Sequence, residues 1–402
     1  MKKIFFIFTS ILLSITLTLT SLAQEAPITE NYTDDIYSMP VVSNEETSTK
    51  LEIKAKSCFL LEAKTNTVLY KNNEKERLAP ASITKIMSIL LVLEKIEQGY
   101  FNLGTKITAS EYACSMGGSQ IWLEPNETMT VDELLRATII ASANDATVAL
   151  AEAVSGSEEA FVNLMNEKAK KLNMKNTYFK NATGLDEEGH YSSAEDIAIM
   201  SAELIKHELV KKYSTVWMDA LRNGDSELVN TNKLVRYYEG CTGLKTGTTG
   251  NAGYCLSATA QRNNMELVAV VLDGATSNDW FNGARKLLDY GFANYSFLEI
   301  KPDLSLLKEI PCKNGLKSTL KLTANKSLNL LLKKSSQKDI VQSVNIPSYI
   351  KAPISQGDVV GKYDIAINGK TVGNIDIVAD ENIAELNFFS AILILLNCIL
   401  LP

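Results

Sequence analysis

The pattern of apolar and polar residues predicts a β-hairpin followed by a long helix near the start of the folded part of the chain. Residues 55–62 and 67–70 are two short apolar runs around a polar turn, which is the pattern of paired strands. From residue 80 to residue 96, apolar side chains recur at the spacing of an amphipathic helix. Gly99 is then expected to end that helix.

The middle of the chain is predicted to be mainly helical, and the stretch after it is predicted to contain several strands. Two buried helices, 131–141 and 145–154, are separated by the polar triplet 142–144. Ser193 is placed to cap a later helix, and Gly291 is placed to end the last one. The other expected helices are 158–172, 193–207 and 279–290, and the expected strands are 243–246, 254–260 and 267–272.

Beyond residue 297 the character of the chain changes, which predicts a second, β-rich domain. Residues 301–380 carry 12 lysines, 7 acidic residues and short alternating runs. The dipeptide Asn368-Gly369 between two such runs is a strong hairpin signal. We divide the chain into a signal peptide (1–23), a flexible acidic leader (24–50), a large domain (51–297), a β-rich domain (298–383) and an apolar tail (384–402).

The N-terminus predicts export from the cytoplasm. Lys2 and Lys3 precede an apolar segment that ends at the small-x-small site Ser21-Leu22-Ala23, as in a cleavable secretory signal. An uncleaved membrane anchor is the alternative. The mature chain is expected to begin near Gln24, outside the cytoplasm.

Composition argues against several kinds of protein. A net charge of −7 without a dominant basic cluster argues against nucleic acid as a partner. Only two histidines are present, so a Ser-His-Asp hydrolase or a histidine-rich metal site is hard to build. We expect neither a metal nor a cofactor. The six cysteines are scattered, and Cys241 with Cys255 is the one pair to check for a disulfide.

Ser82 and Lys85 are the first pair with catalytic potential. They are i and i+3 on the predicted helix, within side-chain reach of each other. A serine hydroxyl needs a neighbouring base, and a lysine serves as one only if burial or another positive charge, such as that of Lys245, lowers its pKa. The backbone N–H of Ser82 is placed to face an oxyanion. Taken alone, the pair is better explained as an N-cap serine followed by a surface lysine.

Two more motifs change this balance. Ser142 and Asn144 occupy the break between two buried helices, where polar side chains need partners. We expect Ser142 to relay a proton and Asn144 to bind substrate backbone, with helix capping as the alternative.

The third motif is Lys245-Thr246-Gly247, at the end of a predicted strand. Gly247 leaves room for an extended ligand beside the strand. Lys245 and the Thr246 hydroxyl are suited to hold an anion such as a terminal carboxylate, and the N–H of Thr248 is the natural second donor to an oxyanion.

In this order the motifs match S-x-x-K, S-x-N and K-T-G, and the chain resembles the D-alanyl-D-alanine carboxypeptidases, which are low-molecular-mass penicillin-binding proteins of the serine type. The resemblance is strong over residues 52–295 and weak over the β-rich segment. The segments that carry it are Pro80-Ala81-Ser82-Ile83-Thr84-Lys85, Gly118-Ser119-Gln120, Ser142-Ala143-Asn144-Asp145-Ala146, His190-Tyr191-Ser192, Lys245-Thr246-Gly247 and Leu287-Leu288-Asp289-Tyr290-Gly291-Phe292.

The resemblance implies an α/β (α+β) fold of the β-lactamase/DD-peptidase type. Its catalytic domain has two lobes, an antiparallel sheet flanked by helices and an all-helical lobe, and is followed by a small C-terminal β domain. Ser82 would form the acyl-enzyme with Lys85 as its base, Ser142 and Asn144 would complete the relay, and Lys245 would anchor the substrate. The expected substrates are peptidoglycan stem pentapeptides, which would lose their terminal D-alanine, and β-lactam antibiotics are the expected inhibitors.

Two positions depart from the family pattern. Thr183 stands where the family's N-P-H-G-L segment commonly has histidine, and Thr248 follows K-T-G where a bulkier residue is common. A serine β-lactamase is the nearest alternative, but no E-x-x-L-N segment lies between Ser142 and Lys245. A catalytically silent penicillin sensor is the other alternative, and the intact motifs argue against it.

The apolar tail predicts contact with the outer face of the cytoplasmic membrane. As a helix, residues 386–401 would span about 24 Å, which is short of a hydrocarbon core of about 30 Å. We therefore expect shallow insertion. A buried helix that closes the β-rich domain is the alternative.

Overall fold

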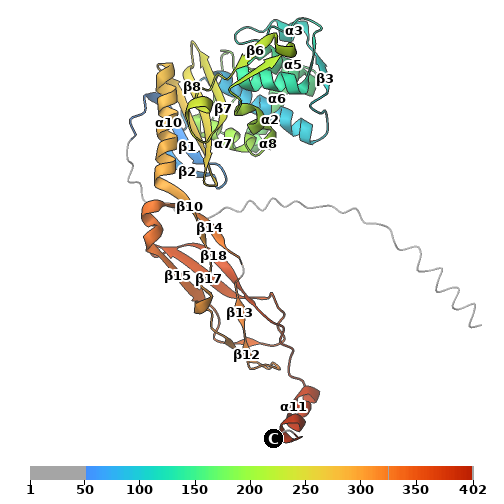
Figure 1. Cartoon of the computed structure of the whole chain (residues 1–402), viewed down its shortest axis with the longest axis vertical. Helices are drawn as coiled ribbons and strands as arrows, with labels where there is room; N and C mark the ends of the chain where they lie inside the picture. Colours follow the sequence, from blue (N-terminus) through green and yellow to red (C-terminus); the bar gives the residue numbers. More distant parts are fainter. Residues whose placement is uncertain (1–50, 325, 401–402) are drawn as a thin grey trace, which may run out of the picture. The chain divides into compact units, whose positions relative to one another are not determined.

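The computed structural model describes residues 51–324 and 326–400 (Figure 1). The predicted signal peptide and leader lie outside the described residues. A five-stranded antiparallel sheet is the centre of the part that carries the three motifs, and its strand order is β2-β1-β9-β8-β7. These strands are β1 (Ala55–Glu62), β2 (Thr67–Asn72), β7 (Cys241–Thr249), β8 (Gly253–Arg262) and β9 (Met265–Gly274). All were expected, although β7 is longer than predicted at both ends.

Both faces of this sheet are buried. Phe59 and Leu61 of β1 point into a core shared with the helices α2 (Lys85–Glu97) and α7 (Ala194–Leu204). Cys58 and Leu60 point to the other side, into a core shared with α10 (Ser277–Asn294). A strand covered on both faces reads as a continuous apolar run, which explains the sequence of β1.

The prediction that Gly291 ends the last helix is wrong. α10 continues through Gly291 to Asn294. A Cβ at Gly291 would lie 2.5 Å from Leu267 Cδ1 and 3.1 Å from Leu60 Cδ2. The glycine therefore permits close packing of α10 on the sheet and does not stop the helix.

The second lobe is built from helices around α2. It contains α4 (Val131–Arg136), a π-helical turn (Ala137–Ala141), α5 (Asn144–Ser155) and α6 (Glu158–Lys171). The predicted break at 142–144 is confirmed, because Ser142 has left-handed backbone angles (φ 64°) and Ala143 is extended. Two short strands, β3 (Lys106–Thr108) and β4 (Thr128–Thr130), and the short helix α3 (Glu111–Cys114) complete this region.

The stretch between α7 and β7 contains four short elements that the sequence pattern did not predict. They are α8 (Glu208–Ser214), β5 (Met218–Leu221), β6 (Ser226–Val229) and α9 (Leu234–Tyr237). β5 and β6 form an antiparallel hairpin.

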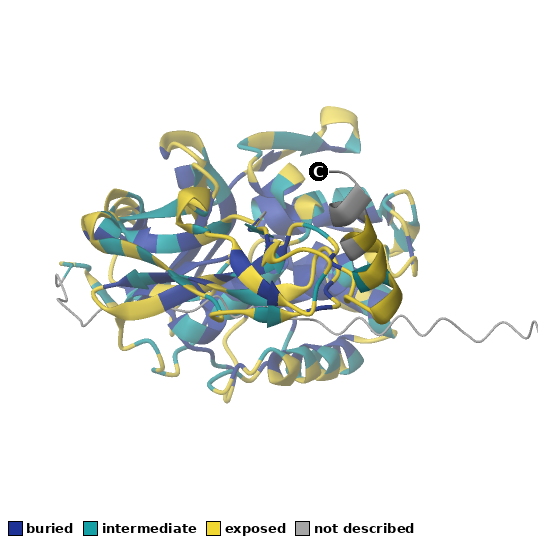
Figure 2. Cartoon of the chain, turned by 90° about the horizontal axis from the view of Figure 1, so that it is seen from below, coloured by how far each residue is buried: buried dark blue, intermediate teal, exposed yellow. Residues whose placement is uncertain are grey.

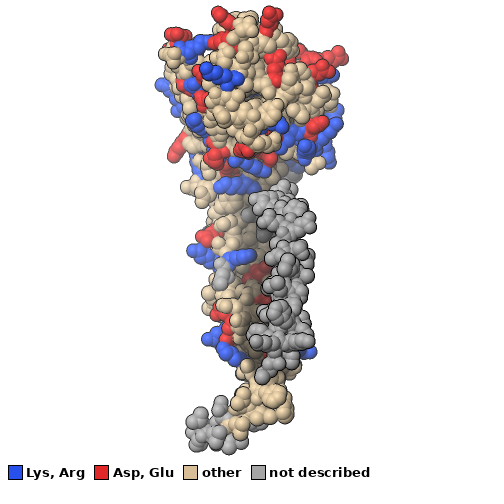
Figure 3. Space-filling view, turned by 90° about the vertical axis from the view of Figure 1, so that its right-hand side faces the viewer, with Lys and Arg blue, Asp and Glu red and all other residues tan. Residues whose placement is uncertain are grey.

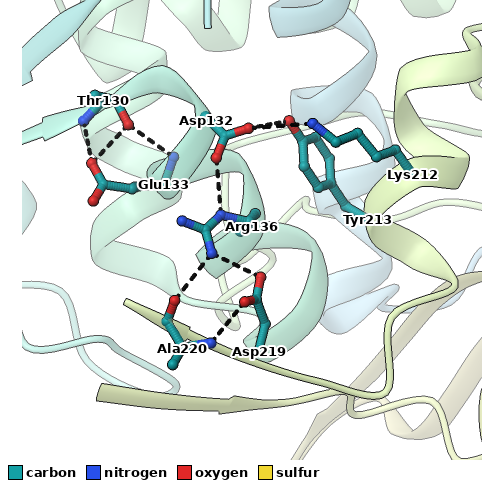
Figure 4. A network of polar contacts seen from close by, with 8 residues as sticks. All are labelled: Thr130, Asp132, Glu133, Arg136, Lys212, Tyr213, Asp219 and Ala220. Atoms are coloured by element: carbon teal, nitrogen blue, oxygen red, sulfur yellow. Dashed lines mark hydrogen bonds and ion pairs between the residues drawn. The ribbon is translucent and has the colours of Figure 1, made fainter. Parts of the chain in front are cut away.

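A polar network fixes this hairpin to the helical lobe (Figure 4). Arg136 of α4 donates to Asp132 at 3.0 Å, to Asp219 at 2.8 Å and to the carbonyl of Ala220 at 3.0 Å. Tyr213 donates from its hydroxyl to Asp132 at 2.5 Å. The guanidinium therefore ties β5 to α4, and the tyrosine ties α8 to the same helix.

The C-terminal part of the chain is β-rich, as expected. β10 (Tyr295–Ile300) pairs with β14 (Leu328–Lys333), and a four-stranded sheet has the order β13-β18-β17-β15. Asn368 and Gly369 both have positive φ angles (49° and 74°), which confirms the predicted tight hairpin between the last two long strands. The remaining strands are β11 (Ile310–Lys313), β12 (Thr319–Leu320), β13 (Leu322–Thr323), β15 (Ile340–Asn345), β16 (Ile350–Lys351), β17 (Val359–Ile367) and β18 (Lys370–Ala379).

The apolar tail forms the helix α11 (Phe388–Leu400). Figure 2 colours most of its described part as exposed, and Phe388 and Phe389 are 74% and 77% exposed. No intramolecular core covers these side chains, contrary to a buried closing helix. In the described part of the chain, no helix has the length and apolarity needed to cross a membrane.

The disulfide considered between Cys241 and Cys255 does not form. Both thiols are free. In the β7–β8 register Cys241 pairs with Ala260, whereas Cys255 pairs with Gly247. The partner of Cys255 therefore lies six residues beyond Cys241 along β7, so the two cysteines do not face each other.

Candidate active site

The structure brings Ser82 and Lys85 into hydrogen-bond contact at the start of a helix. Ser82 lies in a 3₁₀ turn (Ala81–Thr84) that leads directly into α2, where Lys85 is the first residue. Lys85 Nζ donates to Ser82 Oγ at 2.9 Å and to the carbonyl oxygen of Thr183 at 2.7 Å. Ser82 is partly exposed, while Lys85 is completely buried. The pair thus combines a solvent-accessible serine hydroxyl with a buried amine in hydrogen-bond contact with it.

Burial holds the pKa of Lys85 well below its ordinary value. Loss of water around the ammonium is the largest cause, and the positive charge of Lys245 lowers this pKa further. The carboxylate of Asp145 acts in the opposite direction. Lys245 is also buried, and desolvation lowers its pKa to about 7. A neutral Lys85 amine has a lone pair that can accept the Ser82 proton.

The contact between Lys85 and Thr183 does not depend on the side chain at position 183, where the family commonly has histidine. Lys85 uses the backbone carbonyl of Thr183, which any residue supplies. Gly184 follows with φ 86°, and a Cβ there would lie 1.8 Å from the carbonyl oxygen of Ala81. The loop therefore sits directly against the Ser82 turn because residue 184 has no side chain.

Ser142 and Asn144 lie at the break between the helices of the second lobe. Both are nearly fully buried. Asn144 donates from Nδ2 to the carbonyl of Gly117 at 2.6 Å, and its backbone N–H donates to Ser119 at 2.6 Å. Its Oδ1 is buried and has no hydrogen-bond partner among the described residues. Asn144 therefore presents a free acceptor while its amide nitrogen fixes the adjacent loop.

Asp145, the next residue, fixes the same loop further along. Its buried carboxylate accepts from the backbone N–H groups of Ile121 (3.1 and 3.2 Å) and Leu123 (3.0 Å). In the sequence Asp145 appears only as the residue that follows Asn144 in the second motif, with no role of its own. The signal that could have identified it is an acidic residue directly after the S-x-N triplet at the start of a largely apolar helix.

β7 is an edge strand of the sheet, and it packs against the Ser82 turn. A Cβ at Gly247 would lie 2.7 Å from the backbone nitrogen of Ser82 and 3.0 Å from that of Ile83. The glycine was expected to leave room for a ligand. The structure gives a different reason, since the space is needed by the protein's own nucleophile turn.

The other residues of this motif lie where the sequence placed them, on β7. Lys245 Nζ donates to the carbonyl of Thr246 at 3.2 Å, and exposed Thr248 pairs with Tyr254 of β8. The Thr246 hydroxyl donates to Thr231 Oγ1 at 2.6 Å. Thr231 is a site residue that the sequence analysis missed, because no motif connects it to Thr246 15 positions later.

The geometry of these residues indicates the class of enzyme to which the protein belongs. A partly exposed serine sits on a helix start, a desolvated lysine is its base, and a lysine-bearing edge strand faces both. No described residues form a metal-binding cluster. This arrangement fits the serine acyl-transfer enzymes of the penicillin-binding type, in which a lysine stands beside the nucleophile where other serine hydrolases have a histidine.

The chain belongs to the D-alanyl-D-alanine carboxypeptidase family, whose model matches residues 43–276. The model of the C-terminal domain of penicillin-binding protein 5 matches residues 301–385. The resemblance found in the sequence is thereby confirmed, as is the expected fold class.

Individual relatives agree with this assignment. The chain is 43% identical to D-alanyl-D-alanine carboxypeptidase DacF of Bacillus subtilis, over 85% of this chain and 89% of that protein. Among solved structures, penicillin-binding protein 5 of Haemophilus influenzae is 30% identical with a TM-score of 0.69, and the match covers 84% of this chain and 99% of that one. Penicillin-binding protein D2 of Listeria monocytogenes in its ampicillin-bound form is 30% identical with a TM-score of 0.55, over 60% and 99% of the two chains.

The packing at Gly247 gives a first prediction. Gly247→Ala should slow acylation of Ser82 by roughly 100-fold, because the new methyl group displaces the turn that carries the nucleophile. The rate is measured with a labelled penicillin. Gly250→Ala is the matched control, since a Cβ there meets no atom within 4 Å. Equal acylation rates in the two variants would contradict the packing argument.

The low pKa of Lys245 gives a second prediction. Below about pH 7 the free enzyme holds this side chain as an ammonium ion, and above about pH 7 it becomes neutral. If it anchors a substrate carboxylate, KM should rise with pH, by about tenfold per unit well above that pKa.

The control for this pH profile is the same peptide with an amidated C-terminus. That peptide should bind more weakly, and its KM should lack the alkaline rise. A KM for the carboxylate peptide that stays constant from neutral to alkaline pH would exclude Lys245 as the titrating anchor.

Proposed function

We propose that this chain is a serine-type D-alanyl-D-alanine carboxypeptidase that removes the terminal D-alanine from peptidoglycan stem pentapeptides. The single observation that carries the proposal is the contact between Ser82 Oγ and the buried, low-pKa amine of Lys85. Family membership supports the same reaction. We infer the role of each residue from the geometry described above.

Acylation begins with proton transfer from Ser82 Oγ to the neutral Lys85 amine. Oγ then attacks the carbonyl carbon of the penultimate D-alanine, and the backbone N–H groups of Ser82 and Thr248 stabilise the oxyanion. The C–N bond breaks, and the leaving D-alanine takes a proton through the Ser142 hydroxyl. That proton is the one which Lys85 took from Ser82, so the amine is neutral again. Water then attacks the ester carbon and gives a proton to Lys85, the bond between that carbon and Ser82 Oγ breaks, and Lys85 returns the proton to Oγ as the shortened peptide leaves.

Substrate binding uses the edge of β7 and the free acceptor on Asn144. In this proposal the peptide lies antiparallel to the unpaired edge of β7 and extends the sheet by one strand. Asn144 Oδ1, buried and without a partner, accepts a peptide N–H. Lys245 and Thr246 hold the terminal carboxylate. Gly247 keeps β7 close enough to the nucleophile for both contacts to form.

The same site accounts for penicillin binding without favouring a β-lactamase. A structural relative was crystallised with ampicillin bound. Rapid deacylation in a class A β-lactamase needs a glutamate beside the nucleophile. Glu158 is the acid that contacts the loop after Asn181, and both of its oxygens are already used, by Ala182 N–H and the Tyr112 hydroxyl.

Covalent labelling tests the assignment of Ser82. Labelled penicillin should attach to Ser82, and Ser82→Ala should release no measurable D-alanine from a D-Ala-D-Ala pentapeptide while its unfolding temperature stays the same. Mass spectrometry of the trapped peptide locates the adduct. An adduct on any other serine, or rapid multiple turnover of penicillin, would refute this function.

We also propose that the protein acts outside the cytoplasm and is attached to the membrane by its tail. Residues 1–23 are then a cleaved signal peptide, 51–297 the catalytic domain, 298–383 the β-rich domain and 384–402 the attachment. The support is α11, whose 13 residues include no charged one and whose Phe388, Phe389 and Leu393 are exposed. Figure 3 shows neither blue nor red on the described part of this helix. At about 1.5 Å per residue it is too short to span a bilayer, which favours shallow insertion.

Truncation tests the membrane attachment. A chain that ends after Glu385 should be soluble and as active as the full-length mature protein, because the removed helix is exposed and carries no site residue. The full-length protein should sediment with membrane vesicles. Mature full-length protein that stays soluble without detergent would contradict the attachment.

A further inference from the structure

Trp122 is an exposed aromatic side chain that the mechanism does not use. It is 74% exposed, whereas its neighbours Ile121 and Leu123 are buried. Its backbone is left-handed (φ 59°), a conformation that costs a bulky residue of order 1–3 kcal/mol. Because the indole is exposed and its backbone conformation is strained, packing does not explain its position.

A buried carboxylate and a half-buried guanidinium fix the backbone around Trp122. Asp145 accepts from the N–H groups on either side of it, at Ile121 and Leu123. Arg222, at the turn of the β5–β6 hairpin, donates to the carbonyl of Ile121 at 2.9 Å and to that of Trp122 at 3.3 Å. The strained conformation is therefore over-determined by contacts from two separate elements.

Arg222 is itself held in place. Glu127 accepts from two of its nitrogens at 2.8 and 2.9 Å, and Ser226 accepts from a third donor position at 2.9 Å. The side chain thus has no freedom to follow a moving loop. Trp122 is presented on a rigid support, as expected of a residue that binds a ligand.

The loop that carries Trp122 contacts residues of the candidate site. At one end, Gly117 and Ser119 bond to Asn144. Gly118 in the same segment approaches Leu185, which lies two residues after the Thr183 carbonyl that receives Lys85. Trp122 therefore lies three residues from a backbone group that touches the substrate-binding asparagine.

The β5–β6 hairpin connects the Trp122 loop to the strand that carries Lys245-Thr246-Gly247. Arg222 holds the Trp122 loop at one end of the hairpin, and Thr231, just past β6, bonds to Thr246 of the K-T-G strand. Trp122 is thereby linked on both sides to groups that face the scissile bond. The Trp122 loop therefore borders the candidate site, and the exposed indole is available to a part of the substrate other than the scissile D-Ala-D-Ala end.

We propose that Trp122 is a specificity-determining residue whose indole stacks on a sugar ring of the glycan attached to the stem peptide. An exposed, rigid aromatic face is suited to the apolar C–H face of a pyranose, and stacking on a fixed ring loses little conformational entropy. This inference rests on the proposed carboxypeptidase function.

The test compares substrates that share the scissile bond. Trp122→Ala should lower kcat/KM by roughly tenfold for a disaccharide-pentapeptide, which corresponds to the loss of one aromatic contact. For a sugar-free N-acetylated pentapeptide the same change should have an effect below about twofold. Trp122→Phe should restore most of the activity on the disaccharide substrate. Tyr100→Ala, at an aromatic residue 64% exposed on another loop, is the matched control.

The outcomes are distinct from those that test the function itself. If the wild-type chain releases no D-alanine from either substrate, the proposed function fails. If it does, an equal loss on both substrates in Trp122→Ala would overturn the glycan contact, because a contact with the peptide or a distorted site would affect both. Unchanged activity on both substrates would overturn it as well.

Discussion

The proposed mechanism depends on one buried amino group, that of Lys85, whose pKa is held well below its ordinary value by burial. Lys85 can act as a base only because its surroundings remove water and offer no carboxylate partner. Asp145 is the acid whose charge opposes this, and the structure occupies its oxygens with the N–H groups of Ile121 and Leu123. The amine donates to the Thr183 carbonyl and to Ser82 Oγ, and these two contacts fix its position beside the serine hydroxyl. One carboxylate displaced toward Lys85 would convert the base into an inert ion pair.

This arrangement costs stability. The pKa of Lys245 is about 7 in the folded chain, below its ordinary value near 10.5, and that of Lys85 is lowered as well. At neutral pH the unfolded chain therefore binds more protons at these two positions than the folded chain does. The contribution of these two lysines to the free energy of unfolding therefore becomes more favourable as the pH increases from about 7 towards 10.5. The large apolar cores on both faces of the sheet offset this cost, so a strained site is carried by a fold that does not depend on it.

The sequence predicted well those parts of the fold in which period and motif act locally. β1, β2, the Asn368-Gly369 hairpin and the break at Ser142 all follow from short-range signals. The region 208–237 was missed because its elements are four to seven residues long and carry no clear period. Gly291 was misread because a glycine that stops a helix and a glycine that lets a helix pack closely look identical in sequence.

The proposed nucleophile, base and anion-binding strand were all named from sequence, whereas the residues that hold them in place were not. Thr231, Arg222 and Gly184 act through contacts with residues 15 to about 100 positions away, and only the fold creates those contacts. The motif residues alone do not make a site, because Lys85 would be an ordinary charged lysine without the loop that buries it. Hydrogen bonds run from Asn144 and Asp145 to the Trp122 loop, from that loop to Arg222 of the β5–β6 hairpin, and from Thr231 beyond the hairpin to Thr246. The rigidity of the candidate site is therefore a property of this series of contacts and not of the motif residues alone.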